Sequence, residues 1–212
     1  MTHYLRPGIV LPTPLRIMVP ALLLLLGGCT NTLVVQGEFP SPQVNQLPIT
    51  LAVHYDEAFR GHTYEEKSKD RSKWVITSGP AQMQLFNRVL PQMFEAVVEV
   101  SEIPPAEAEV DLILAPAIKE FQYAVPRETK VNVFEVWIKF NMQVFDKNGE
   151  LIADWILPAY GKTPTAFLKS KEEAMNEAVV VALRDIGASL SLGFTRVPEI
   201  RAWLEQHQRA ML

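Results

Sequence analysis

The stretch Val131-Asn-Val-Phe-Glu-Val-Trp-Ile-Lys-Phe-Asn-Met-Gln-Val-Phe145 alternates apolar and polar side chains along most of its length. This period of two predicts a β-strand with one buried face. Asp146-Lys-Asn-Gly149 follows, and Asn and Gly tolerate the positive φ angles of tight turns. Residues 151–160 then predict the returning strand. A β-hairpin is therefore the element around which the rest of the chain is organised.

Further strands are predicted on the N-terminal side of this hairpin. Residues 49–55 place Ile49, Leu51, Val53 and Tyr55 on one face, which is typical of a half-buried strand. Trp74-Val75-Ile76 predicts a short strand, and residues 97–100 fit either a strand or a helix end. Residues 111–123 predict a longer strand, in which Pro116 indicates an edge position or a bulge.

Three stretches predict helices. One starts near Pro80 and carries an apolar stripe that Pro91 should kink or interrupt: Met83, Phe86, Leu90 and Met93. A second begins at the capping box Ser170-Lys-Glu-Glu173 and ends at Gly193. A third begins at Pro198. The order of elements predicts an α+β fold, in which an antiparallel sheet of about four strands has two or three helices packed on one face.

The N-terminus has the features of a secretory signal peptide. Arg6 and Arg16 precede or flank an apolar run that ends in five consecutive leucines, and Gly27-Gly28 follow. The apolar run from Ile17 to Leu26, interrupted only by Pro20, is about half the length that a membrane-spanning helix needs. We therefore expect the segment to be removed rather than to remain as an anchor.

Leu26-Gly27-Gly28-Cys29 resembles the lipobox of bacterial lipoproteins, in which leucine and two small residues precede the cysteine. The resemblance implies lipidation of Cys29, cleavage before it and acylation of the new amino group. Several acyl chains anchor a protein stably where one chain is marginal. Thr30 is not the Asp that retains lipoproteins in the inner membrane, so the resemblance implies the periplasmic face of the outer membrane.

These features divide the chain into a signal peptide over 1–28, a lipidated tether over 29–48 and a single α+β domain over 49–212. Gly37 and the prolines between Pro40 and Pro48 predict that the tether is flexible. Such a coil would reach roughly 25 Å from the membrane.

Charge argues against nucleic acid as a partner. The full chain carries a net charge of −4, and removal of residues 1–28 takes away two arginines and no acid, leaving −6. No basic surplus is available to neutralise phosphates. An acidic chain is also repelled by anionic lipid heads. We expect the lipid on Cys29, rather than overall charge, to hold the protein to the membrane.

The sequence offers little for catalysis or for metal binding. His54, Asp56, Glu57 and His62 form the densest group of ionisable side chains, but two histidines across a loop fall short of the convergent ligands that a metal needs. Phosphate-binding loops, nucleophile elbows and zinc-protease motifs are absent from the sequence. We therefore expect no enzyme activity, no metal and no cofactor.

Two tryptophans are candidates for binding. Trp137 lies on the otherwise polar face of the best predicted strand, and Trp155 lies on its partner strand. Aromatic side chains on a wet sheet face are typical of protein interfaces, although a terminal helix or the linker could equally cover Trp137.

The predicted layout resembles that of envelope-assembly lipoproteins such as the lipopolysaccharide-transport lipoprotein, in layout only. The leading hypothesis is a non-catalytic lipoprotein that binds or scaffolds an envelope protein. The first alternative is a carrier that holds a lipid or another apolar ligand between the Met- and Phe-rich helix and the sheet. A hydrolase with an unrecognised site is the second alternative.

Overall fold

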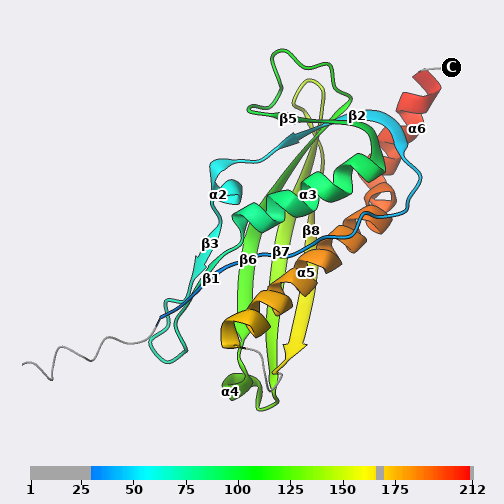
Figure 1. Ribbon diagram of the computed structural model, residues 1–212. Coiled ribbons are helices and arrows are strands. Elements are labelled where there is room, and N and C mark those ends of the chain that lie inside the picture. Colours follow the sequence, from blue (N-terminus) through cyan, green and yellow to red (C-terminus); the bar gives the residue numbers. More distant parts are fainter. Residues whose placement is uncertain (1–29, 166–169, 211–212) are drawn as a thin grey trace, which may run out of the picture. The chain divides into compact units, whose positions relative to one another are not determined.

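The predicted hairpin is present as strands β7 (Val133–Asp146) and β8 (Leu151–Pro164) in a computed structural model of the chain, which describes residues 30–165 and 170–210 (Figure 1). Gly149 adopts a φ of 83° in the connecting turn. The Asp146 carboxylate accepts hydrogen bonds from the backbone N–H groups of Asn148 and Glu150. The hairpin prediction is therefore confirmed, and the turn closes through the residues that predicted it.

Strand β6 (Leu112–Ala124) completes an antiparallel meander with β7 and β8. On its other side, β6 pairs with a neighbouring strand only over residues 112–114. Pro116 lies beyond this paired segment, where the lack of a backbone N–H costs no hydrogen bond to that strand. A register shift between Ile118 and Glu120 marks a bulge. Pro116 therefore lies on a locally unpaired side of an interior strand, and the bulge falls further along the strand, between Ile118 and Glu120.

The main sheet differs from the predicted antiparallel sheet of about four strands. It has five strands in the order β5-β2-β6-β7-β8, and β2 (Leu47–His54) runs parallel to both of its neighbours, β5 (Phe94–Val100) and β6. Parallel neighbours need a long crossover connection, and the chain between β2 and β5 includes a helix. Alternation predicts that a strand exists but not its direction, so the α+β class is confirmed and the sheet type is corrected.

A second, smaller sheet was not predicted. Its order is β1-β4-β3, formed by β1 (Asn31–Val34), β4 (Trp74–Thr77) and β3 (Thr63–Glu65). β1 runs parallel to β4, and β3 runs antiparallel to it. The short helix α2 (Glu57–Arg60) lies between β2 and β3 in the chain. This sheet incorporates residues 31–34, which were expected in the tether.

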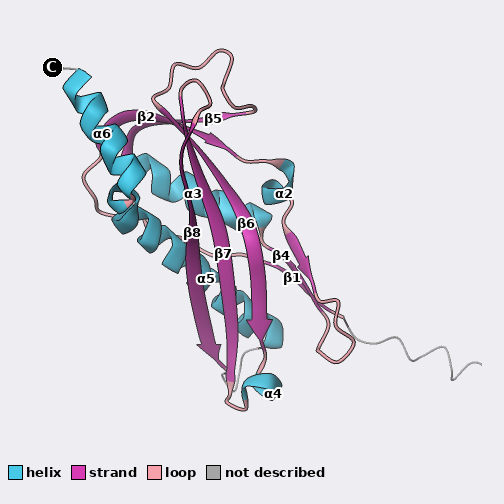
Figure 2. Ribbon diagram, turned by 180° about the vertical axis from the view of Figure 1, so that it is seen from behind, coloured by secondary structure: helices cyan, strands magenta, loops and turns pink. Residues whose placement is uncertain are grey.

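Helices α3 (Gly79–Met93) and α5 (Lys171–Gly193) cover one face of the main sheet (Figures 1 and 2). The predicted capping box is present, because Ser170 Oγ accepts from the N–H of Glu173 and the Glu173 carboxylate accepts from the N–H of Ser170. α5 is long and apolar enough to span a bilayer, but half of its most apolar window is buried in the fold. In this fold α5 is a core helix that packs against the main sheet.

Three shorter or terminal elements complete the described chain. α4 (Pro126–Thr129) lies in the turn between β6 and β7, and the 3-10 turn η2 (Phe194–Arg196) follows α5. α6 (Pro198–Ala210) is the predicted last helix, and it inserts Ile200 into the core. The core itself lies between the sheet and helices α3 and α5, where rings from different elements pack together: Tyr55, Phe59, Phe86 and Phe140.

Residues 35–46, which we call the strap, are packed against the helices instead of forming the expected flexible linker. Val35 and Phe39 are only 3% and 6% exposed. Gln36 exchanges two hydrogen bonds with the Asn176 side chain, and Arg184 donates to the carbonyl of Glu38. The prolines and Gly37 break the strand and helix periods, but they are compatible with an extended chain lying across α3 and α5 (Figure 1).

Candidate functional site

Cys29 lies outside the described residues, as does the whole of the expected signal peptide. The structure does show where the following residues go. Asn31 opens β1, and both its backbone N–H and its side-chain amide donate to the carbonyl oxygen of Lys73 at 3.0 Å. The folded unit therefore begins two positions after Cys29, with its first residue bound to the loop before β4.

Trp137 lies on the face of the main sheet that the helices leave open. Its neighbours in β7, Val136 and Ile138, point into the core, whereas Trp137 is 39% exposed. Its cross-strand partner is Tyr160, which is 37% exposed, and the two ring centroids are 5.4 Å apart. Figure 2 views the sheet from this side and shows β6, β7 and β8 without a helix in front of them. The pair forms an accessible aromatic platform.

Charged groups surround this platform. Lys139 Nζ lies 2.5 Å from Glu120 Oε2, and the Tyr160 hydroxyl donates to Glu135 at 2.5 Å. The hydrogen bond to Glu135 raises the pKa of Tyr160 to about 12, with burial as a smaller cause. A shallow hollow lies beside the rings and is lined by Glu120, Gln122, Trp137 and Lys139. The platform is therefore apolar at its centre and polar around it.

Ile156 extends the apolar surface along β8. Its side chain is 48% exposed, on the same face as Tyr160 four residues later. Its cross-strand neighbour Asn141 is buried. Sequence reasoning did not select Tyr160 or Ile156. The sequence shows that side chains alternate between the two faces of β8. Which of the two sets faces solvent depends on the register of β8 with β7, which the sequence does not give.

Trp155 lies on the opposite face of the sheet from Trp137. It pairs with the buried Met142 and packs edge-on against Phe194 at a centroid distance of 6.4 Å. Trp155 is partly buried against the core. The two tryptophans selected from the sequence therefore do not share a surface, and only Trp137 contributes to the open face.

The free edge of β8 is blocked over its last residues. The backbone N–H of Tyr160 points away from β7 and donates to Asp185 of α5 at 3.1 Å. Pro158 and Pro164 lie at positions of β8 whose backbone nitrogens also point away from β7, and proline has no N–H to donate. An added strand would find few donors here, as in other protected sheet edges.

The ionisable residues grouped around His54 have separate structural contacts. His54 Nδ1 contacts the carbonyl of Val100 at 3.2 Å, and Asp56 caps α2 by accepting from the N–H of Phe59. His62 lies across α2, with Nδ1 2.8 Å from Ser78 Oγ. Among the described residues, no group of three or more His, Cys, Asp or Glu side chains is arranged to hold a metal ion.

The His62–Ser78 contact has the atom types of a catalytic dyad but lacks an accessible nucleophile. Ser78 is fully buried, and its Oγ also accepts from Gln82 Nε2 at 2.6 Å. Burial lowers the pKa of His62. A hydroxyl that no substrate can reach does not act as a nucleophile, so this network is better explained as support for the start of α3.

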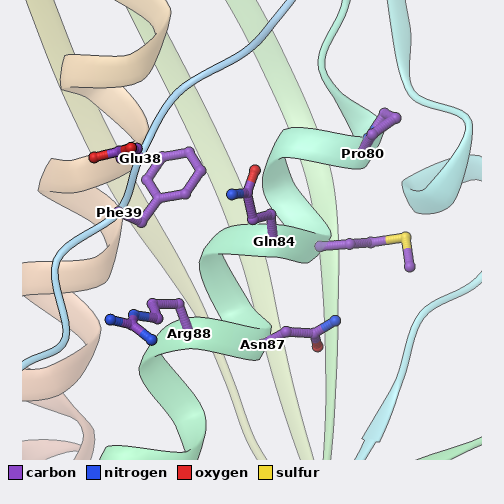
Figure 3. Close-up of a pocket in the computed structure, with 7 residues that line it drawn as sticks. Glu38, Phe39, Pro80, Gln84, Asn87 and Arg88 are labelled. Carbon is purple, nitrogen blue, oxygen red and sulfur yellow. The ribbon is translucent and has the colours of Figure 1, made fainter.

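Most of the apolar stripe of α3 fills the core, whereas Met83 is partly exposed and lines a surface groove. Phe86, Leu90 and Met93 are buried between α3 and the sheet. A groove does occur on the outer side of α3, where Figure 3 shows Glu38 and Phe39 of the strap together with Gln84, Asn87 and Arg88 of the helix. This groove is open to solvent and mixes the apolar side chains of Phe39, Pro80 and Met83 with polar ones, unlike the enclosed apolar cavity that a lipid carrier requires.

A network of ion pairs centred on Arg71 ties the loop between β3 and β4 to α4. The guanidinium donates to Glu66 at 2.7 Å and to both carboxylate oxygens of Glu128 at 2.8 and 2.9 Å. It also donates to the carbonyl of Tyr123 and lies 4.4 Å from the centre of that ring. The hydrogen bonds from Arg71 lower the pKa of Glu128. The loop is thus held in place at the end of the sheet where β1 begins.

No family model matches the sequence, and no curated protein matches it. Among solved structures, protein XCC0632 from Xanthomonas campestris, described as DUF330, superimposes with a TM-score of 0.49 and 11% identity over 86% of this chain and 97% of that one. A minor lipoprotein from Acinetobacter baumannii gives a TM-score of 0.46 and 12% identity over 73% of this chain and 97% of its own. Similarity at this level carries no argument about function.

Proposed function

We propose that this chain is a non-catalytic lipoprotein of the bacterial cell envelope, held on the periplasmic face of the outer membrane by lipid on Cys29, and that it binds an envelope protein. The observation that carries the binding role is the exposed pair of Trp137 and Tyr160 on an uncovered sheet face. The membrane location is supported by the signal-peptide pattern, the lipobox ending at Cys29 and the Thr that follows it.

The composition of the open face favours a protein partner over an apolar small molecule. The exposed aromatic pair is flanked by the Lys139–Glu120 ion pair and by the amide of Gln143 bound to Asp154 at 3.1 Å. Protein interfaces combine aromatic anchors with such a polar rim. A small apolar ligand would leave these charged groups beside it without adequate solvation.

The partner would lie against the face of the sheet rather than extend its edge. Pro158, Pro164 and the Asp185-bound N–H of Tyr160 leave few donors for an added strand at the end of β8. Side-chain contacts with Trp137 would therefore supply the affinity, since main-chain pairing is blocked beside it.

The absence of catalysis is part of the proposal. The side chains best suited to acid–base or nucleophilic chemistry already have structural partners: Asp56 caps α2, and Ser78 is buried beneath His62 and Gln82. A protein whose reactive groups support its own fold is suited to binding rather than turnover.

The lipid anchor is tested on the native protein purified from membranes. The mass of its N-terminal peptide should correspond to a chain that begins at Cys29 and carries diacylglycerol and an N-acyl group. A Cys29→Ser variant should retain the precursor mass. Recovery of a wild-type chain with residues 1–28 attached, or with a free Cys29 thiol, would contradict the proposal.

The binding face is tested by photocrosslinking in cells. A photoreactive amino acid at position 137 should give one discrete adduct, and Tyr160→Ala should abolish it without changing the thermal stability of the protein. A photoreactive amino acid at position 192 is the control, because Leu192 is an exposed apolar residue on α5. Equal labelling from positions 137 and 192 would argue against a specific face.

A further inference from the structure

We infer that the loop from Lys67 to Lys73 rests on anionic lipid headgroups in the leaflet that carries the anchor. This inference depends on the proposed lipid at Cys29, but it adds a contact that the anchor alone does not require. Three features support it: the folded unit begins at Asn31, basic side chains lie near that residue, and the loop is held by hydrogen bonds and ion pairs.

The first observation is distance along the chain. Asn31 is bound through its backbone and its side chain to the carbonyl of Lys73. Only two peptide units separate Cys29 from Asn31, so their α-carbons can lie at most about 7 Å apart. The attraction between Lys and an anionic surface extends over a Debye length of about 8 Å at physiological ionic strength. An anchored Cys29 therefore brings this loop within range, whereas a flexible tether of the expected length would not.

The second observation is that positive charge is concentrated at this end of an acidic protein. Lys67, Lys69 and Lys73 are exposed, and Asp70 is the acid among residues 67–73. Arg71 is paired with both Glu66 and Glu128, so these three side chains together carry a charge of −1. The neighbouring α4 turn, which Arg71 joins to the loop, adds the exposed Arg127 and Lys130. Residues 65–73 and 127–130 together carry six basic and four acidic side chains, a local net charge of +2 in a chain whose total is −4.

The third observation is that the loop is fixed before it meets a membrane. The Arg71 contacts with Glu66 and Glu128 restrain its middle, and the Tyr123 hydroxyl donates to the carbonyl of Ser72 at 2.5 Å. Lysines presented on a restrained loop lose less conformational entropy on binding than lysines on a free chain. We expect each lysine to strengthen association with an anionic surface roughly fivefold, which corresponds to ~1 kcal/mol.

The test places a fluorescent probe on the loop of the lipidated protein in vesicles. Cys29 is the chain's one cysteine and would carry the lipid, so a Ser72→Cys substitution supplies a single free thiol for a polarity-sensitive dye. Ser101→Cys is the matched control, because Ser101 is also exposed but follows β5, at the end of the sheet opposite β1 (Figure 1). Vesicles of phosphatidylcholine alone are compared with vesicles that also contain phosphatidylglycerol.

The dye at position 72 should shift to shorter wavelength when phosphatidylglycerol is present, and the dye at position 101 should not. Combining Lys67→Glu, Lys69→Glu and Lys73→Glu should reverse the shift, as should high salt. Equal responses at positions 72 and 101, or a shift at position 72 that survives the triple substitution, would overturn the inference. The N-terminal mass of the same preparation separates this failure from failure of the lipid anchor itself.

Discussion

Gly161 of β8 lies directly against Ala178 of α5, so a β-carbon on this glycine would collide with the carbonyl oxygen of Ala178. The added β-carbon would also meet the backbone nitrogen of Ala182, and neither backbone atom can rotate away as the end of a long side chain can. We expect Gly161→Ala to lower the free energy of unfolding by about 3 kcal/mol. Gly193→Ala is the control, because no atom lies near its added methyl group, and it should stabilise by about 0.5 kcal/mol. Chemical denaturation measures both.

Arg71 should control how easily the loop from Lys67 to Lys73 is cleaved. Arg71→Gln removes its ion pairs with Glu66 and Glu128 and should increase the rate of tryptic cleavage after Lys67, Lys69 and Lys73 severalfold. Arg127→Gln makes the same change at an exposed neighbouring arginine and should leave that rate unaltered. Mass spectrometry of the fragments over time measures the rate. Similar cleavage of Arg71→Gln and wild type would show that the ion pairs do not restrain the loop.

His62 should make the protein less stable in mild acid. Burial lowers its pKa in the folded state below the ordinary value of 6.5, so between these two pKa values the unfolded chain binds more protons. The free energy of unfolding should therefore fall as the pH decreases from 6.5 towards the pKa of the folded state. His62→Asn should remove that slope. The comparison needs denaturation curves of both proteins across this range, and parallel pH profiles would refute the assignment.

Trp137→Ala and Trp155→Ala should have opposite consequences. Trp155 packs against Phe194 beneath the helices, so its removal should destabilise the fold by about 3 kcal/mol. Trp137 is exposed, and its removal should change stability by less than about 1 kcal/mol while abolishing capture of the partner in a pull-down. Thermal unfolding followed by circular dichroism separates the two variants. Strong destabilisation by Trp137→Ala would indicate a packing role for this residue.

Phe39→Ala tests whether residues 35–46 are a strap or a linker. Phe39 is 6% exposed where it lies, so truncation should cost about 3 kcal/mol of stability. Gln46→Ala is a milder substitution in the same segment, because the Gln46 side chain makes one hydrogen bond, to the carbonyl of Pro91, at an exposed position. A flexible linker would give no effect for either variant, which would contradict the packing described.

The sequence was informative where the local pattern and the three-dimensional environment agree. The β7–β8 hairpin and the Ser170–Glu173 capping box depend on residues close to each other in the chain, and both were predicted correctly. The parallel pairing of β2 with β5 was missed, because alternation carries no information about strand direction. Phe39 was missed because a single buried ring among prolines has no period.

The candidate binding face was predicted in part for the same reason. The polar neighbours of Trp137 showed correctly that it faces away from the core. Trp155 could not be placed, because a register shift opposite Val144 and Phe145 changes the phase of β8. As a result, Leu151 lies opposite Phe145 and is exposed, whereas Trp155 lies opposite Met142 and packs against the core. Such shifts depend on strand pairing, which the β8 sequence alone does not reveal.

The strap has a consequence for the order in which the protein can be completed. Gln36 binds Asn176, a residue 140 positions further along, so these contacts cannot form until α5 has emerged during synthesis or export. Closing so long a chain segment is entropically unfavourable and favours late assembly. The N-terminal end would then stay open longest. On the proposed role, that delay gives the modifying enzymes time to act on the cysteine before the folded protein restricts their approach.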